Sequence, residues 1–126
     1  MLEIQEKLTD GGYEELRARV SGAVLHITEA LDGGEVTGFI AYSYENDRTV
    51  VYDYDDGGEL LLCDGLVRSV MFKSCMKGIE TMSFELPSQD KYASLRKLRF
   101  LQEGSTVCDD LDGFMNACER CPSCPS

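Results

Sequence analysis

The sequence is short of long apolar runs, because none approaches the roughly 20 residues that a helix needs to cross a bilayer. Its first residues, Met-Leu-Glu-Ile-Gln-Glu, have neither the basic nor the apolar region of a signal peptide. We therefore expect a cytoplasmic protein with no membrane partner. Histidine is also scarce, since His26 is the only one. A lone histidine in a strand-like segment is more often structural than catalytic, and a Cys/His nucleophile would need a cysteine folded beside it.

Basic residues are few: 12 Lys and Arg stand against 23 Asp and Glu, which gives a net charge of −11. Nucleic acids and anionic membranes bind to basic surfaces, so this balance predicts that neither is a main partner. It favours a cationic partner instead, such as a small-molecule or peptidyl amine. The alternative interpretation is that the charge only keeps a small protein soluble.

Cysteine, in contrast, is abundant, with six in 126 residues. In a reducing compartment such cysteines are more often thiols or metal ligands than disulfides. Three of them form the motif Cys118-x-x-Cys121-x-x-Cys124, whose two-residue spacers let neighbouring thiolates reach one metal ion. Cys108 is the candidate fourth ligand of a zinc site. An iron–sulfur cluster, a redox-active Cys-x-x-Cys pair and no specific role are the open alternatives.

A hydrophobic fraction of 43% in 126 residues is enough for the core of one domain. We assign residues 1–117 to that domain and residues 118–126 to a Cys/Pro-rich tail. Apolar alternation predicts strands, and an apolar period of 3.6 residues predicts helices. The expected strands are 2–8, 23–30, 36–44, 49–54, 79–85, 100–101 and 106–107, and the expected helices are 13–20, 59–77, 88–98 and 111–118.

The clearest unit runs from Arg48 to Gly78 and consists of a strand, a Gly-rich turn and a long helix. Its strand follows the preceding strand after a short polar turn, which predicts a hairpin. Asp56 or Gly58 is the expected cap at the start of the helix, and Gly78 is the expected stop. A strand, a helix and another strand in sequence imply a right-handed crossover between parallel strands. The predicted class is therefore α/β, with a central mixed sheet and helices on both faces.

Within this unit, residues 62–67 read Leu-Cys-Asp-Gly-Leu-Val. Together with the order of elements, this stretch resembles the coenzyme A loop of the GCN5-related N-acetyltransferase (GNAT) family, Gln/Arg-x-x-Gly-x-Gly/Ala. The resemblance extends from Leu2 to about Val107 and rests on architecture and a few residues. Gly65 fits the pattern, whereas Leu62 and Val67 stand where a polar and a small residue are usual.

The resemblance implies an acyl-CoA N-acyltransferase-like fold in which backbone N–H groups at the start of a helix hold acetyl-CoA. Asp64 places a negative charge where the pyrophosphate would lie, and Arg68 would partly offset that charge. The alternative cradle is the Gly-rich stretch Asp56–Glu59, in which Gly57 and Gly58 are nearer to the strand end.

A second match is found at residues 94–100. This stretch resembles the family's helix that ends in Gly-Phe, with a tyrosine five residues before the Phe that protonates the leaving thiolate. Phe100 matches, Arg99 replaces the glycine, and Leu95 replaces the tyrosine. Leu95 cannot transfer a proton, so the resemblance leaves Tyr92, one helical turn earlier, as the candidate general acid.

The strand before the long helix alternates Tyr52 and Tyr54 with Asp53 and Asp55. Tyrosines on one face would line a ligand groove, which makes Tyr54 a candidate cofactor contact. Carboxylates at the strand end would deprotonate an amine, and ligands of α/β folds bind at that end. Asp55 and Asp56 are therefore the candidate catalytic carboxylates. The alternative is an ordinary sheet with one half-buried and one solvated face.

Three functions stay open on these grounds. The first is a divergent acetyl-CoA-dependent N-acetyltransferase acting on an amine, with altered cofactor-loop and general-acid motifs. The second is a catalytically inactive GNAT-fold binding or regulatory module, for which a homodimer is one expected form. The third is a metal or thiol-redox protein that uses its C-terminal cysteines, with zinc or an iron–sulfur cluster as cofactor.

Overall fold

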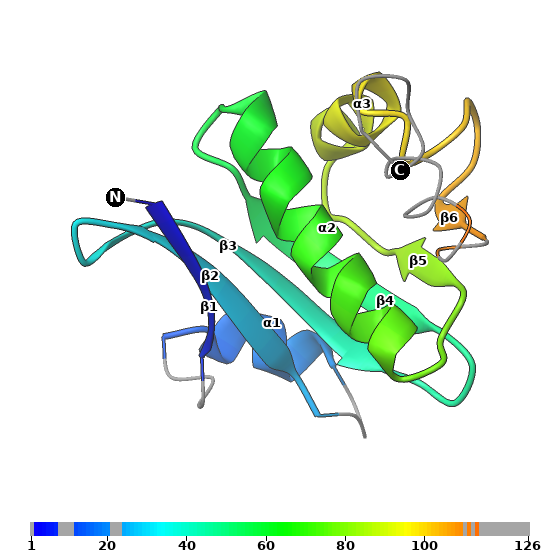
Figure 1. Ribbon diagram of the computed structural model, residues 1–126, viewed down its shortest axis with the longest axis horizontal. Helices are drawn as coiled ribbons and strands as arrows, with labels where there is room; N and C mark the ends of the chain where they lie inside the picture. The colour runs from blue at the N-terminus through cyan, green and yellow to red at the C-terminus, as the bar shows by residue number, and fades with distance from the viewer. Residues whose placement is uncertain (1, 8–11, 21–23, 110, 112, 114–126) are drawn as a thin grey trace, which may run out of the picture.

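The computed structural model describes residues 2–7, 12–20, 24–109, 111 and 113, and the strands of this part form a mixed sheet (Figure 1). The strands are β1 (Leu2–Lys7), β2 (His26–Asp32), β3 (Glu35–Tyr44), β4 (Thr49–Asp55), β5 (Met82–Phe84) and β6 (Val107–Cys108). The helices are α1 (Glu14–Arg19), α2 (Leu60–Met76) and α3 (Gln89–Lys97). As far as α3 their order agrees with the sequence-based expectation, and the α/β class is confirmed.

The strands lie in the sheet in chain order, from β1 to β6. The predicted hairpin of β3 and β4 is confirmed, and so is the parallel pair of β4 and β5 that α2 connects. The other two strand–helix–strand units are antiparallel, so extending the crossover rule to them is wrong. In the first of them α1 has six residues, about 9 Å of helix, which is too short to return the chain along β1.

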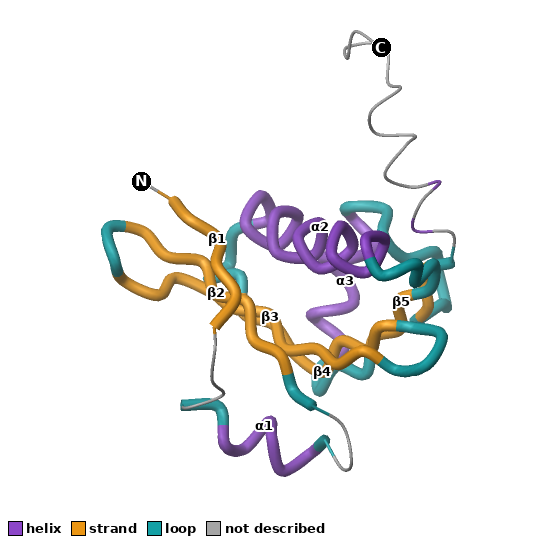
Figure 2. Tube along the Cα trace, turned by 60° about the horizontal axis from the view of Figure 1, so that its bottom comes forward, coloured by secondary structure: helices purple, strands orange, loops and turns teal. Residues whose placement is uncertain are grey.

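Different helices cover the two faces of the sheet, as predicted (Figure 2). α2 packs on one face over the larger hydrophobic cluster, to which α3 contributes Tyr92 and Leu95. α1 packs on the opposite face, where Leu16 and Val20 contact a smaller cluster that includes Ile27. The two clusters together bury both sides of the central strands, which fixes the position of β4 between them.

The long helix α2 ends as predicted but begins differently. Gly78 follows it with a φ of +78°, the left-handed conformation that stops a helix. The N-cap is Glu59, with no side-chain cap, so the caps expected at Asp56 and Gly58 are wrong. The carboxylate of Asp56 instead accepts the backbone N–H of Gly58 in the turn before the helix.

The chain after α3 departs from the expected pair of short strands. The strand predicted at 100–101 is not formed; Phe100 and Leu101 are both buried in the cluster under α2. Arg99 takes a φ of +68°, which turns the chain sharply at this point. The apolar pair therefore packs inward from a turn rather than from a sheet edge.

The helix expected at 111–118, the domain boundary after residue 117 and the tail 118–126 fall almost wholly outside the described residues. Among the helices that the structure does describe, none is long and apolar enough to cross a membrane.

Candidate functional site

The candidate site lies where β4 and β5 separate. The pairing of the two strands ends at Val51 and Phe84, and one further hydrogen bond of 2.8 Å joins the Glu85 N–H to the Val51 carbonyl. β5 ends there, whereas β4 continues to Asp55. The far end of β4 therefore faces a gap rather than a strand. Ligands of α/β folds bind at such points, where neighbouring strands diverge at their carboxyl ends.

A β-bulge in β4 lies at the point of separation. Two consecutive residues of β3 pair with Val51 and Asp53, so Tyr52 is the extra residue between them. Tyr52 packs with the cluster under α1, whereas Tyr54 belongs to the cluster under α2. The expectation that the two tyrosines share one face is wrong, because the bulge interrupts the two-residue alternation.

Tyr54 is held in the core. Its side chain is 2% exposed, and its hydroxyl donates to the Lys91 carbonyl at 2.6 Å. Burial raises the pKa of this phenol well above its usual range. Tyr54 thus fastens α3 to β4, and its side chain does not line an open groove.

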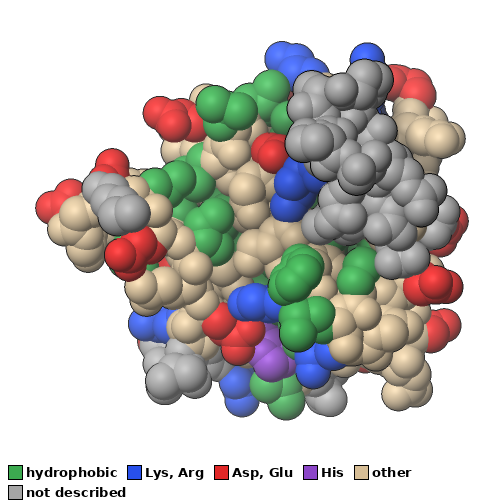
Figure 3. Space-filling view, viewed as in Figure 1, with side chains coloured by type: hydrophobic (Ala, Val, Ile, Leu, Met, Phe, Trp, Pro, Cys, Tyr) green, Lys and Arg blue, Asp and Glu red, His purple; other side chains and the backbone are tan. Residues whose placement is uncertain are grey.

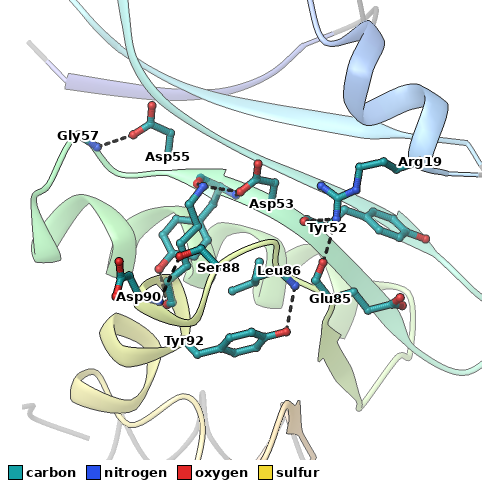
Figure 4. Close-up of polar contacts among 12 residues, drawn as sticks. Arg19, Tyr52, Asp53, Asp55, Gly57, Glu85, Leu86, Ser88, Asp90 and Tyr92 are labelled. Carbon is teal, nitrogen blue, oxygen red and sulfur yellow. Dashed lines mark hydrogen bonds and ion pairs between the residues drawn. The ribbon is translucent and has the colours of Figure 1, made fainter.

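Arg19, at the end of α1, spans the gap between the two strands (Figure 4). Its Nη2 donates to the Tyr52 carbonyl at 3.3 Å and to the Glu85 carbonyl at 3.2 Å. The sequence analysis missed this residue, because its two partners lie 33 and 66 positions away and no local pattern marks them.

Lys91, from α3, reaches the same gap farther along β4. Its Nζ donates to Asp53 Oδ1 and to the Tyr54 carbonyl, the latter at 2.6 Å. Lys91 was also missed, although its spacing of four residues from the buried Leu95 places the two on one face of α3. Arg19 and Lys91 together satisfy the polar groups of β4 that face the gap.

The turn between β4 and α2 is closed by its own carboxylates. Asp55 Oδ1 accepts the Gly57 N–H, and Asp56 Oδ1 accepts the Gly58 N–H, both at 2.9 Å. The sequence predicted these glycines as amide donors to a cofactor and these aspartates as catalytic groups. The structure brings all four together and pairs them with one another. In this arrangement the carboxylates occupy the positions at which an external anion would meet the amides.

A pocket of about 410 Å³ adjoins this turn. Asp32, Asp56 and Glu59 line it beside Gly57 and the exposed Leu61. Three carboxylates in one pocket repel an anion. The electrostatics of this end of the sheet therefore oppose tight binding of a pyrophosphate.

The alternative cofactor stretch, residues 62–67, lies within α2. Gly65 is helical there, and a Cβ added to it would lie 3.3 Å from Ile4 Cδ1 of β1. Arg68 Nε donates to both carboxylate oxygens of Asp64 at 3.0 Å, so the predicted charge offset is present. Because helical amides bond within the helix, the turn Asp56–Glu59 has the better placed backbone.

Tyr92, the candidate general acid, is tied to backbone groups. Its hydroxyl donates to the Phe84 carbonyl at 2.9 Å. It also accepts the Leu86 N–H at 2.9 Å (Figure 4). The side chain is 6% exposed. These bonds hold α3 against the end of β5, and proton transfer from Tyr92 would require breaking the bond to Phe84.

We expect Tyr92→Phe to lower the free energy of unfolding by about 1–3 kcal/mol, because it leaves two buried backbone groups without their partner. Urea denaturation measures this change. The control is Tyr52→Phe, which removes the hydroxyl of a half-buried side chain that bonds to the Ser43 hydroxyl at 2.9 Å, and should cost less because one hydrogen bond is lost instead of two. Equal stability of Tyr92→Phe and the wild type would contradict the positioning role.

The cysteines divide between the core and the tail. Cys63 is fully buried, and burial raises the pKa of its thiol to about 11, which makes it a poor nucleophile. Cys108, the expected fourth zinc ligand, is buried in β6, whereas Cys118, Cys121 and Cys124 lie outside the described residues. Within the part of the chain that is described, no three His, Cys, Asp or Glu side chains cluster as metal ligands.

No protein-family model matches the sequence, and no curated protein matches it. Solved structures do match. The ribosomal-protein-S18-alanine N-acetyltransferase of Escherichia coli has a TM-score of 0.60 at 14% identity, over 81% of this chain and 79% of its own. AtaT complexed with acetyl-methionyl-tRNAfMet has a TM-score of 0.58 at 14% identity, over 93% and 99%. The KacTA–DNA complex has a TM-score of 0.57 at 16% identity, over 93% and 99%.

The comparisons correct one expectation. The sequence analysis excluded nucleic acid as a partner on the ground of net charge, yet two of these similar structures are complexes with tRNA or DNA. A net charge describes the whole chain and does not determine the charge of a local contact surface, so excluding nucleic acid as a partner was wrong. The resemblance drawn from the sequence is confirmed at the level of architecture: the chain has the fold of the GCN5-related N-acetyltransferases.

Proposed function

We propose that the protein is an N-acyltransferase that transfers an acyl group, most simply acetyl, from coenzyme A to an amine. The observation that carries the proposal is the gap between β4 and β5, at the bulge of Tyr52, in a chain with this fold. Backbone groups of an unpaired strand edge are suited to hold an extended acyl-carrying arm by strand-like hydrogen bonds.

The fit of coenzyme A to these residues is uneven. The gap has the backbone edge that the arm needs, once Arg19 leaves the carbonyls of Tyr52 and Glu85 and Lys91 leaves the Tyr54 carbonyl. The turn before α2 has two backbone amides, those of Gly57 and Gly58, but the carboxylates of Asp55 and Asp56 already accept them. Because these carboxylates repel the pyrophosphate, we expect weak cofactor binding, with a Kd in the micromolar to millimolar range. When bound, acetyl-CoA supplies an activated thioester.

The amine has a candidate base in Asp55. This residue is exposed at the end of β4, and its charge contributes to the raised pKa of Tyr13 on the α1 face, after burial and the Glu29 carboxylate. Asp55 thus lies at the end of β4, the strand that borders the gap. Its Oδ1 accepts the Gly57 N–H, which leaves the second oxygen to take a proton from the amine.

Acetyl-CoA should raise the melting temperature. A ligand at ten times its Kd stabilises the native state by about 1.4 kcal/mol, which is about 5 °C for a chain of this size. Differential scanning fluorimetry with acetyl-CoA measures the shift, and sodium sulfate at the same ionic strength controls for general anion effects. The absence of any shift at millimolar acetyl-CoA would overturn the proposal.

The acceptor is identified by a panel of amines incubated with radiolabelled acetyl-CoA. The panel contains polyamines, peptides with free N-termini and aminoacylated tRNA, the last because AtaT is complexed with an acetylated one. Transfer to one class above the rate without protein supports the activity and names the substrate class. Cofactor binding without transfer to any amine would contradict the acyltransferase function.

A further inference from the structure

An open pocket of about 440 Å³ lies near the C-terminal end of α2 and is lined by side chains from β1, β2, β3 and the end of α2. The side chains that line it are Glu6, His26, Tyr44, Lys73, Met76 and Lys77. α2 has 17 residues, so about 24 Å of helix separate this pocket from the turn before Leu60. Figure 3 shows the histidine on this face among basic, acidic and hydrophobic side chains.

The pocket is positively charged, although the chain carries a net charge of −11. Glu6 is the one carboxylate among its six lining residues, and Lys73 Nζ binds Glu6 Oε1 at 3.0 Å. Lys73 also donates to Thr28 Oγ1 at 3.2 Å. Lys77 Nζ lies 4.7 Å from the centre of the Tyr44 ring, a cation–π distance. After Glu6 and Lys73 neutralise each other, the charge of Lys77 is left in excess.

His26 adds a charge that depends on what enters the pocket. Its ring stacks on Tyr42 at 5.6 Å and meets Tyr44 at 4.9 Å, and its Nδ1 lies 3.9 Å from Glu6 Oε2. Burial lowers the pKa of His26, the lysines at 73 and 77 lower it further, and Glu6 opposes them. An anion placed beside the ring would reverse this balance, because it favours the imidazolium.

We propose that this pocket binds the phosphate group of a small phosphate monoester. A phosphate monoester carries close to two negative charges at neutral pH, and Lys77 and a protonated His26 together supply two positive ones. The Tyr44 ring and the exposed side chain of Met76 form an apolar wall for the organic part of the ester. The terminal carbonyls of α2 favour lysines at this end. They do not account for the convergence of those lysines with His26 on one hollow.

The test uses the full chain and nuclear magnetic resonance, because a single histidine gives one unambiguous set of imidazole signals. The probe is phenyl phosphate, compared with sodium chloride at the same ionic strength, in titrations between pH 5 and pH 8. We expect phenyl phosphate to raise the pKa of His26 and chloride to leave it lower. The same His26 pKa in both salts would overturn the proposal.

Two lysine variants identify the pocket as the source of the effect. Lys77→Met should weaken phenyl phosphate binding about fivefold or more and keep the aliphatic stem over Tyr44. Lys97→Met removes the same charge from an exposed position on α3 and should leave binding unchanged. Equal loss in the two variants would overturn the proposal by showing that only the overall charge matters.

Glu6→Gln supplies an independent readout of the opposite sign. It removes the carboxylate that competes with the ligand for Lys73, so phenyl phosphate should bind several-fold more tightly. Weaker binding to this variant, with an unchanged melting temperature, would contradict the proposal. The outcome is separate from that of the acyltransferase test, because phenyl phosphate carries no thioester and its readout is the His26 signal rather than acyl transfer to an amine.

Discussion

Replacing Gly38 by alanine is expected to lower the free energy of unfolding by about 3 kcal/mol. An added Cβ at this position would lie 2.4 Å from the Asp55 carbonyl oxygen and 3.1 Å from Leu62 Cδ2. Real Cβ atoms do not approach backbone oxygens so closely, and backbone within a sheet cannot move aside as a flexible side chain does. The variant should therefore separate β3 from the end of β4, where the candidate site begins.

Gly65→Ala is the matched control for this substitution. Its added Cβ would meet only the terminal Cδ1 of Ile4 at 3.3 Å, and alanine is the better helix former by about 1 kcal/mol. Urea denaturation should distinguish the two variants, with a clear loss of stability for Gly38→Ala and no loss for Gly65→Ala. Two variants of equal stability would contradict the close approach of β3 and β4.

Gly65→Ala also distinguishes the two stretches that are candidates for contact with the cofactor, the turn Asp56–Glu59 and residues 62–67. If the turn Asp56–Glu59 meets the cofactor, Gly65→Ala leaves acetyl-CoA binding unchanged. If residues 62–67 meet it, the added methyl group lies at the contact and binding is lost. The thermal shift with acetyl-CoA thus decides between the alternatives that the sequence left open.

The sequence predicts the elements of this fold well because their periods are local. The long helix α2 and the hairpin of β3 and β4 each follow from the spacing of apolar residues along the chain. The end of α2 is also predictable, because Gly78 alone supplies the left-handed conformation that stops the helix. The bulge at Tyr52 is different, because it depends on the register between two strands. An alternating sequence cannot reveal a register shift, and that shift decides which side chains share a face.

The candidate site was only partly accessible from sequence for a similar reason. Asp55 and Asp56 are candidates from the sequence because they follow a strand and precede a helix, a position that can be recognised along the chain. Arg19 and Lys91 were not, because each reaches β4 from another element. The sequence also could not show that the amides of Gly57 and Gly58 are already hydrogen-bonded. A Gly-rich turn predicts available amides but not the side chains that accept their N–H groups.

Because the carboxylates of Asp55 and Asp56 accept the amides of this turn, removing their charge should favour the cofactor. The double substitution Asp55→Asn and Asp56→Asn should tighten acetyl-CoA binding about tenfold. An asparagine side chain keeps the oxygen that accepts the Gly57 or Gly58 N–H, so the turn retains its shape. What is lost is two negative charges at the place where the diphosphate would lie. Isothermal titration calorimetry at low salt measures the change in Kd.

A charge-matched control makes the result specific. Glu45→Gln with Asp47→Asn changes the net charge by the same amount, in the turn between β3 and β4 rather than before α2. At about 0.1 M salt these positions, at the opposite end of the seven-residue strand β4, lie farther from the turn than the Debye length of about 10 Å, so the control should leave acetyl-CoA binding near the wild-type value. The gain in the first variant should also shrink as salt is added. If both variants gain affinity equally, the cofactor responds to the net charge of the chain and the turn is not its site. If Asp55 is instead the base beside the thioester, any gain in affinity comes from Asp56 alone and acyl transfer becomes slower, which the two single substitutions distinguish.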